Sequence, residues 1–164
     1  KQISLDNVKQ INRYVQENRH FINYEQTSSG ENIICAIADI RKTKENSQDY
    51  DEMINTLSKI SGIDYPKKDL VGIPFVEKVI HTENRQLLEL IKNEKFEYYP
   101  LLDKAFERIT DADFKKDVQK LKIDYPDLKQ AVRLASYDAL KLLEGQINSP
   151  FFKEENSENH LTTV

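Results

Sequence analysis

The chain has 164 residues, of which 38% are hydrophobic and 32% are charged, and its formal net charge is −4. A chain of this length can bury about 70% of the surface that it exposes when unfolded, so it needs no disulfide or metal to fold. The acidic balance would repel phosphate backbones, and we therefore predict that the chain binds no nucleic acid.

The single cysteine, Cys35, excludes a disulfide within the chain. One thiol suits the cytoplasm and also an extracytoplasmic compartment reached after removal of a signal peptide, so the composition favours neither localisation. The longest purely apolar run, Ile33 to Ala38, is too short to span a bilayer. No transmembrane segment is predicted.

The spacing of apolar residues predicts an all-α fold. Only four glycines and five prolines are present, and no segment keeps up the strict alternation typical of half-buried strands. We predict a single-domain bundle of about five to seven helices with few or no strands, formed by residues 1–145. The polar residues 146–164 are predicted to be a tail that is mobile or partly docked.

Two helices are predicted first in chain order. Ser4 can cap a helix that runs to about Glu25. A strongly apolar helix follows from Ile33, and Ser28 with Glu31 has the spacing of a capping box for it. The second helix is expected to be among the most buried.

Ser47 can cap a third helix, which is predicted to end where Gly62 can adopt a left-handed conformation. Residues 65–74 contain two prolines and a glycine, so they are predicted to be a connector. The fourth helix should begin at Pro74, with a break at Thr82 in its apolar face.

Pro100 is predicted to open a fifth helix, because proline is favoured at the first helical position. Thr110 and Asp113 can cap a separate helix, so a kink or break is expected there. Residues 125–144 are predicted to form the central helix. Its start is indicated by Pro126 and its end by Gly145.

Small side chains recur every four residues along the predicted central helix, at Ala131, Ala135 and Ala139. Such a ladder lets a neighbouring backbone approach closely, which is why this helix is expected to lie between others. The tetrapeptide Ile-Asp-Tyr-Pro occurs at 63–66 and again at 123–126. We interpret it as a device for entering helices, because the apolar positions around the two copies do not superpose.

No motif indicates catalysis. Glu17 and His20 have the spacing of one di-iron motif, but the second motif which that architecture needs is absent. Cys35 lies in an apolar run that would raise its pKa, which makes it a poor nucleophile. We predict no metal site and no cofactor, and an uncharacterised enzyme is only the third hypothesis.

The first hypothesis for function is a non-enzymatic helical module that binds a protein partner, such as an adaptor, an inhibitor or immunity-type protein, or a secretion-associated factor. It follows from the mixed-charge amphipathic helices, from tyrosines next to prolines that are expected to be exposed, and from the lack of catalytic motifs. The predicted partner-binding residues are Tyr65, Tyr98 and Tyr99.

The alternative hypothesis is a carrier for an apolar small molecule. Phe96, Phe106 and Phe114 cluster in the sequence of a chain that has no tryptophan. Aromatic clusters usually fill cores, but three phenylalanines could also line a cavity between helices.

Overall fold

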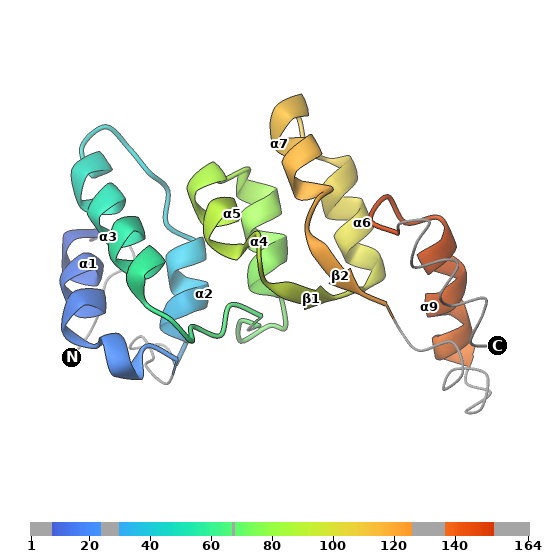
Figure 1. The fold of residues 1–164 in the computed structure, drawn as a ribbon, viewed down its shortest axis with the longest axis horizontal. Helices are drawn as coiled ribbons and strands as arrows, with labels where there is room; N and C mark the ends of the chain where they lie inside the picture. The colour runs from blue at the N-terminus through green and yellow to red at the C-terminus, as the bar shows by residue number, and fades with distance from the viewer. Residues whose placement is uncertain (1–7, 24–29, 67, 126–136, 153–164) are drawn as a thin grey trace. The chain divides into compact units, whose positions relative to one another are not determined.

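The computed structural model describes residues 8–23, 30–66, 68–125 and 137–152 (Figure 1). The described residues are mostly helical and include a small two-stranded parallel sheet, so the prediction of a helical fold with few strands is confirmed. They divide into two compact units, Lys1–Ile91 and Lys92–Val164. No helix in the described part of the chain is long and apolar enough to cross a membrane.

The first unit is a set of packed helices. Its elements are α1 (Val8–Glu17), the 3-10 helix η1 (Arg19–Phe21), α2 (Ile33–Ala38), α3 (Ser47–Lys59), α4 (Phe75–Thr82) and α5 (Arg85–Ile91). Helix α1 packs against α3, helix α2 packs against α4, and α5 contacts both α3 and α4 (Figure 1). Each helix thereby buries its apolar stripe against a neighbour.

Helix α2 is among the most buried of the described elements, as the sequence predicted, since all six of its residues are buried. Its cap differs from the predicted capping box. The side chain of Asn32 accepts the N–H of Cys35 at 2.8 Å. The predicted cap, Ser28, lies outside the described residues, and so does the predicted start of the first helix at Ser4.

The ends of α3 differ from the prediction. Asn46 is the residue before the helix, so Ser47 is its first residue rather than its cap. The helix stops at Lys59 because Ile60 is already extended, with ψ 123°. Gly62 does have a positive φ of 79°, but it shapes the loop after the helix and not the helix end.

The predicted break after Thr82 is confirmed. Glu83 adopts a left-handed conformation with φ 48° and ψ 45°, which ends α4 and separates it from α5. Asn84 then caps α5, because its Oδ1 accepts the N–H of Leu87 at 3.0 Å. Its Nδ2 also donates to the hydroxyl of the buried Tyr50 at 2.6 Å, which ties the start of α5 to α3.

The second unit combines helices with the sheet. Its elements are β1 (Lys95–Glu97), α6 (Pro100–Glu107), α7 (Ala112–Val118), β2 (Lys122–Asp124) and α9 (Tyr137–Ile147). The strands β1 and β2 are parallel, and Phe96 pairs with Ile123 in their register.

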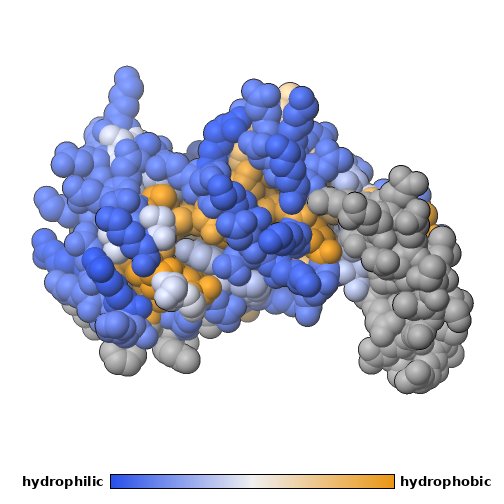
Figure 2. All heavy atoms as spheres, viewed as in Figure 1, coloured by the Kyte–Doolittle hydropathy of each residue, from blue (hydrophilic) through white to orange (hydrophobic). Residues whose placement is uncertain are grey.

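Hydrophilic residues cover much of the face drawn in Figure 2, as the charge content requires.

Pro100 opens α6, as predicted. The break before α7 is also confirmed, but its cap is Asp111 rather than Thr110. The Oδ1 atom of Asp111 accepts the N–H of Asp113 at 2.9 Å and that of Phe114 at 3.1 Å. Asp111 therefore satisfies the first free donors of the helix.

The predicted central helix is described only in part, because residues 126–136 and with them Ala131 and Ala135 lie outside the described residues. Its predicted end is wrong, since α9 continues through Gly145 to Ile147. A Cβ atom added at Gly145 would lie 3.3 Å from the hydroxyl oxygen of Tyr98. Gly145 thus permits a close approach between α9 and Tyr98 instead of a left-handed turn.

One helix-and-strand pattern occurs twice, 27 residues apart. Helix α5 begins at residue 85 and α7 at residue 112, and β1 begins at residue 95 and β2 at residue 122. The side chain of the cap residue accepts the N–H three residues on in both copies, at 3.0 Å for Asn84 and 3.1 Å for Asp111. The carbonyl of each cap also accepts the N–H four residues on.

A three-residue segment, made of an apolar residue, an acidic residue and a tyrosine, occurs before the first copy of this pattern and again at the end of each copy. The three copies are Ile63-Asp64-Tyr65, Phe96-Glu97-Tyr98 and Ile123-Asp124-Tyr125. The apolar residue of each copy is buried, with 6%, 3% and 9% of its surface exposed. The first two copies are each followed by a helix and then by a helix with an Asn or Asp cap.

This pattern corrects the interpretation of the Tyr-Pro pairs. Pro100 does start a helix, but Pro66 lies in a turn well before α4 begins at Phe75. Of the two Tyr-Pro corners within the described residues, only the one at Pro100 begins a helix, and Pro126 lies outside the described residues. The repeated unit is an apolar–acid–tyrosine segment, a first helix and a capped second helix.

Candidate partner-binding site

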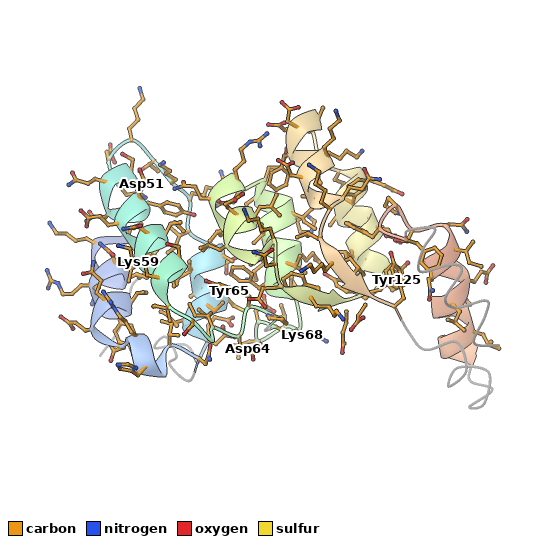
Figure 3. All side chains as sticks on the ribbon, in the orientation of Figure 1. Asp51, Lys59, Asp64, Tyr65, Lys68 and Tyr125 are labelled. Atoms are coloured by element: carbon orange, nitrogen blue, oxygen red, sulfur yellow. The ribbon has the colours of Figure 1, made fainter. Side chains whose placement is uncertain are left out.

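Residues 68–74 form a closed loop in the connector between α3 and α4, at the position of Lys68 in Figure 3. Lys68 and Pro74 form an antiparallel bridge at its base. The N–H of Asp69 donates to the carbonyl of Ile73 at 2.9 Å, and the N–H of Gly72 donates to the carbonyl of Asp69 at 3.0 Å. Gly72 has φ 89°, a conformation that other residues adopt only under strain.

The carboxylate of Asp69 organises this loop from inside. Its Oδ1 atom accepts the N–H groups of Val71 at 3.0 Å and Ile73 at 2.8 Å. Its Oδ2 atom lies 3.0 Å from the Nζ atom of Lys78. Burial raises the pKa of Asp69, but the hydrogen bonds from Ile73 and Lys78 lower it by more, so the pKa is below its ordinary value.

Lys78 fastens the loop to α2, because its Nζ atom is also 2.7 Å from the carboxylate of Asp39. Burial lowers the pKa of Lys78, but the two carboxylates raise it by more, so the pKa is above its ordinary value. Two further bonds come from the start of α2. Asn32 donates to the carbonyl of Lys68 at 3.1 Å, and Glu31 accepts the N–H of Leu70 at 3.3 Å.

The tip of the loop is apolar and exposed. Leu70 is 67% exposed and Val71 is 81% exposed. Burying such side chains fully is worth roughly 1.5 to 3 kcal/mol each. A loop held by this many hydrogen bonds therefore presents two side chains that would gain free energy by leaving water.

The predicted partner-binding tyrosines are less exposed than expected. Tyr65 is 5% exposed and its ring lies 5.5 Å from that of Phe75. Tyr98 is also 5% exposed, and Tyr99 is half-buried. The expected exposure is wrong for Tyr65 and Tyr98, because both rings help to close the core. Their role in binding a partner stays a prediction.

Tyr98 instead belongs to a hydrogen-bonded cluster in the second unit. Its hydroxyl donates to Oδ2 of Asp103 at 2.7 Å, and the hydroxyl of Ser149 donates to Oδ1 at 2.8 Å. The hydroxyl of Tyr125, at the end of β2 in Figure 3, lies 3.3 Å from that of Ser149. Both oxygens of the carboxylate are thus occupied within the protein.

Burial and the nearby carboxylate of Asp103 raise the pKa values of both tyrosines, that of Tyr125 to about 12 and that of Tyr98 further. Both hydroxyls are therefore neutral at physiological pH. The ring of Tyr125 lies 4.9 Å from that of Tyr98 and 4.9 Å from that of Phe152. The cluster anchors the start of the predicted tail and is structural.

The three phenylalanines of the carrier hypothesis are all buried. Phe96 is 3% exposed, Phe106 7% and Phe114 0%. Phe106 packs edge-on against Phe151 at 5.1 Å, and the Nζ atom of Lys115 lies 5.0 Å from the centre of the Phe106 ring. Their described contacts are with other side chains, and the cavity stays a prediction.

The residues considered for catalysis each have a different environment in the structure. His20 is exposed, and His81 pairs with Glu77 at 3.4 Å. Burial raises the pKa of the Cys35 thiol, which suits a structural role. Within the described ranges, no group of three or more His, Cys, Asp and Glu residues could hold a metal ion.

Leu70 and Val71 were missed from the sequence, although a signal was present. In Asp69-Leu-Val-Gly72 an Asx turn and a glycine enclose two apolar residues, and an apolar pair at the tip of a turn is unusual. No known family matches this chain, and neither curated proteins nor solved structures show significant similarity to it.

Proposed function

We propose that this chain is a helical protein-interaction module, built from tandem copies of one small unit. The observation that carries the proposal is the repeated segment, helix and capped helix, with its second and third segments paired in register as β1 and β2. Tandem helical units form extended surfaces that proteins commonly use for binding other proteins.

The remaining polar clusters support a binding role rather than a catalytic one. The carboxylate of Asp103 is occupied by two hydroxyls, and that of Asp69 by two N–H groups and Lys78. Groups engaged in this way hold the fold and present little reactivity. The exposed apolar tip at Leu70 and Val71 is, by contrast, suited to contact with another protein.

The test is a search for a defined binary complex. The full chain is used to capture proteins from cells of its source, and each captured protein is then purified and titrated against the chain by calorimetry. We expect a complex of fixed stoichiometry with a Kd in the micromolar range or below. If no purified candidate binds, the proposal is wrong.

Native mass spectrometry of the purified chain checks the carrier alternative. A mass equal to that of the polypeptide is the expected result. A retained apolar molecule that is lost on unfolding would favour the carrier instead.

A further inference from the structure

We infer that the outer edge of β2, the edge that faces away from β1, binds an extended segment of a partner protein as a third parallel strand. The segment that fits has a basic, an apolar and an acidic residue in that order. The inference rests on the proposed function, because it names a surface through which the module binds. Within the described ranges β2 pairs with β1 alone, and an open strand edge is a template for a further strand.

The strand pair itself shows what such an edge binds. With the tyrosine that follows each strand, β1 reads Lys95-Phe-Glu-Tyr98 and β2 reads Lys122-Ile-Asp-Tyr125. The strands are parallel and in register, so each residue type lies beside its own kind. A strand of this pattern therefore already binds a second strand of the same pattern along one edge. The outer edge of β2 offers the same pattern one step further on.

Two contacts between the strands should recur at the outer edge. The N–H of Tyr98 donates to the carbonyl of Asp124 at 2.8 Å, and the Nζ atom of Lys95 lies 3.6 Å from Oδ1 of Asp124. The same step from β2 brings the N–H of Tyr125 to the carbonyl of an acidic residue and the exposed ammonium of Lys122 to its carboxylate. The charge at this edge thus favours an acidic residue in the bound segment.

The rest of the chain indicates how long the segment is and where it comes from. The ring of Tyr125 lies 4.9 Å from that of Tyr98 and 4.9 Å from that of Phe152, so Phe152 already supplies the next aromatic contact and the segment can end at its acidic residue. Residues 126–164 contain no further Lys-apolar-acid-Tyr sequence. The two such sequences of this chain pair with each other, which favours a different protein over a second copy.

Parallel pairing also fixes which backbone groups face the edge. Successive residues of a strand turn their N–H and C=O groups to opposite sides. Asp124 turns its carbonyl to β1, so Ile123 and Tyr125 turn theirs to the outer edge. In the bound segment the acidic residue faces β2, just as Asp124 faces β1, and the apolar residue before it faces away.

The probe is a synthetic peptide copied from residues 93–97, Asn-Glu-Lys-Phe-Glu, with both ends blocked. It is titrated into the 15N-labelled full chain while the amide NMR shifts are recorded. We expect saturable shifts centred on Ile123 and Tyr125 with a Kd of about 0.1 to 1 mM, because so short a segment makes few contacts. A chain whose β2 amides do not respond to the peptide overturns the inference and leaves the proposed function standing. Failure of the chain to bind any captured protein overturns both.

Two N-methylated peptides test the direction of pairing. A methyl group on the nitrogen of the final glutamate, copied from Glu97, blocks the N–H that faces β2 and should abolish binding. A methyl group on the nitrogen of the residue copied from Phe96 is the matched control, because that N–H faces away, and it should leave Kd within about twofold. The reverse result would place the peptide on the outer edge of β1 and overturn the inference.

A charge exchange tests the contact with Lys122. Lys122→Glu should raise Kd about two- to fourfold, as expected for an exposed ion pair, and a peptide with lysine in place of its final glutamate should recover the loss. Lys120→Glu is the matched control, because Lys120 is also exposed but pairs with Asp117 on α7. Equal effects of the two substitutions would contradict the assigned contact.

Sedimentation of the chain alone identifies the source of the segment. We expect a monomer at all concentrations used in the titration. Self-association that Lys122→Glu weakens would make the bound segment part of a second copy and overturn the inference of a different protein.

Discussion

The side chain of Asp69 links the loop of residues 68–74 to α4. Its carboxylate holds two backbone N–H groups of the loop and pairs with Lys78 of α4, which in turn pairs with Asp39. Only the ionised carboxylate can serve all of these donors, which is why its pKa is lowered. The stability of the loop should therefore depend on pH.

Asp69→Asn tests this dependence. A folded-state pKa below the unfolded value of about 3.9 adds stability above that pH, and the contribution is lost as the pH falls through the folded-state pKa. We expect the substitution to cost about 1 to 2 kcal/mol at pH 7, because a hydrogen-bonded charge pair is lost. Urea unfolding at pH 7 and pH 3 should show that the difference between native and variant chains shrinks at the lower pH. An equal difference at both values would contradict the assigned role of the charge.

Gly145 gives a second prediction at the scale of single residues. Alanine there would gain about 1 kcal/mol of helix propensity, but its Cβ would lie 3.3 Å from the Tyr98 hydroxyl. That hydroxyl is held by Asp103, so it cannot move away easily. We expect Gly145→Ala to destabilise the native chain by about 0.5 to 1 kcal/mol through overpacking.

The same substitution in a Tyr98→Phe background removes the obstacle. There Gly145→Ala should stabilise the chain by about 0.5 to 1 kcal/mol, because only the helix propensity remains. Urea unfolding of the four chains measures both effects as a double-mutant cycle. A stabilising effect of equal size in both backgrounds would mean that Gly145 does not contact Tyr98.

At the scale of elements, the repeated capped helix makes a paired prediction. Asp111→Ala removes a cap and should cost about 1 kcal/mol. Asn84→Ala removes the equivalent cap and also leaves the buried hydroxyl of Tyr50 without this partner, so it should cost about 2 to 3 kcal/mol. In a Tyr50→Phe background the cost of Asn84→Ala should fall to about 1 kcal/mol. Equal costs in the two backgrounds would contradict the bond between Asn84 and Tyr50.

The elements were predictable from the sequence where one strong local signal decides them. The apolar run of α2, the proline that opens α6 and the breaks after Thr82 and before α7 all follow from local patterns. Caps were less predictable, because several Asn, Asp, Ser and Thr residues compete near each start. The caps of α2 and α7 are Asn32 and Asp111, whereas the spacing predicted Ser28 and Thr110. Spacing alone does not give the geometry that decides which of these residues caps the helix.

Two features depended on contacts far apart in the chain. Gly145 resembles a helix stop in the sequence, but in the structure a glycine is favoured there because the hydroxyl of Tyr98, which is distant in sequence, lies close to it. The strands β1 and β2 have three residues each, too few for a periodic signal, and their parallel pairing is visible only once α6 and α7 are folded between them. Comparing the sequence with itself at a shift of 27 residues would have revealed the Lys-apolar-acid-Tyr pattern of Lys95–Tyr98 and Lys122–Tyr125.

At the scale of the whole molecule, the formal net charge of −4 predicts its behaviour toward polyanions. Nucleic-acid binding depends on cations that replace counterions along the phosphates. Fluorescence anisotropy with duplex DNA should therefore detect no binding at physiological salt. Binding that weakens steeply as salt is raised would contradict this prediction and indicate a basic surface.

The two compact units and the repeated segment are the structural basis of the proposal that this chain binds a protein partner. The candidate site differs from the tyrosines that the sequence suggested, because the rings of Tyr65 and Tyr98 are buried in the core. The loop of residues 68–74 has its backbone donors bonded within the protein, and its tip is apolar and exposed.

The most direct measurement is the heat capacity change when the full native chain binds a captured and purified protein, taken from calorimetric titrations at several temperatures. Burial of apolar surface on binding gives a negative heat capacity change. We predict a complex of fixed stoichiometry with such a change. The absence of a complex, or a heat capacity change near zero, would contradict the central claim that the chain buries apolar surface against a protein partner.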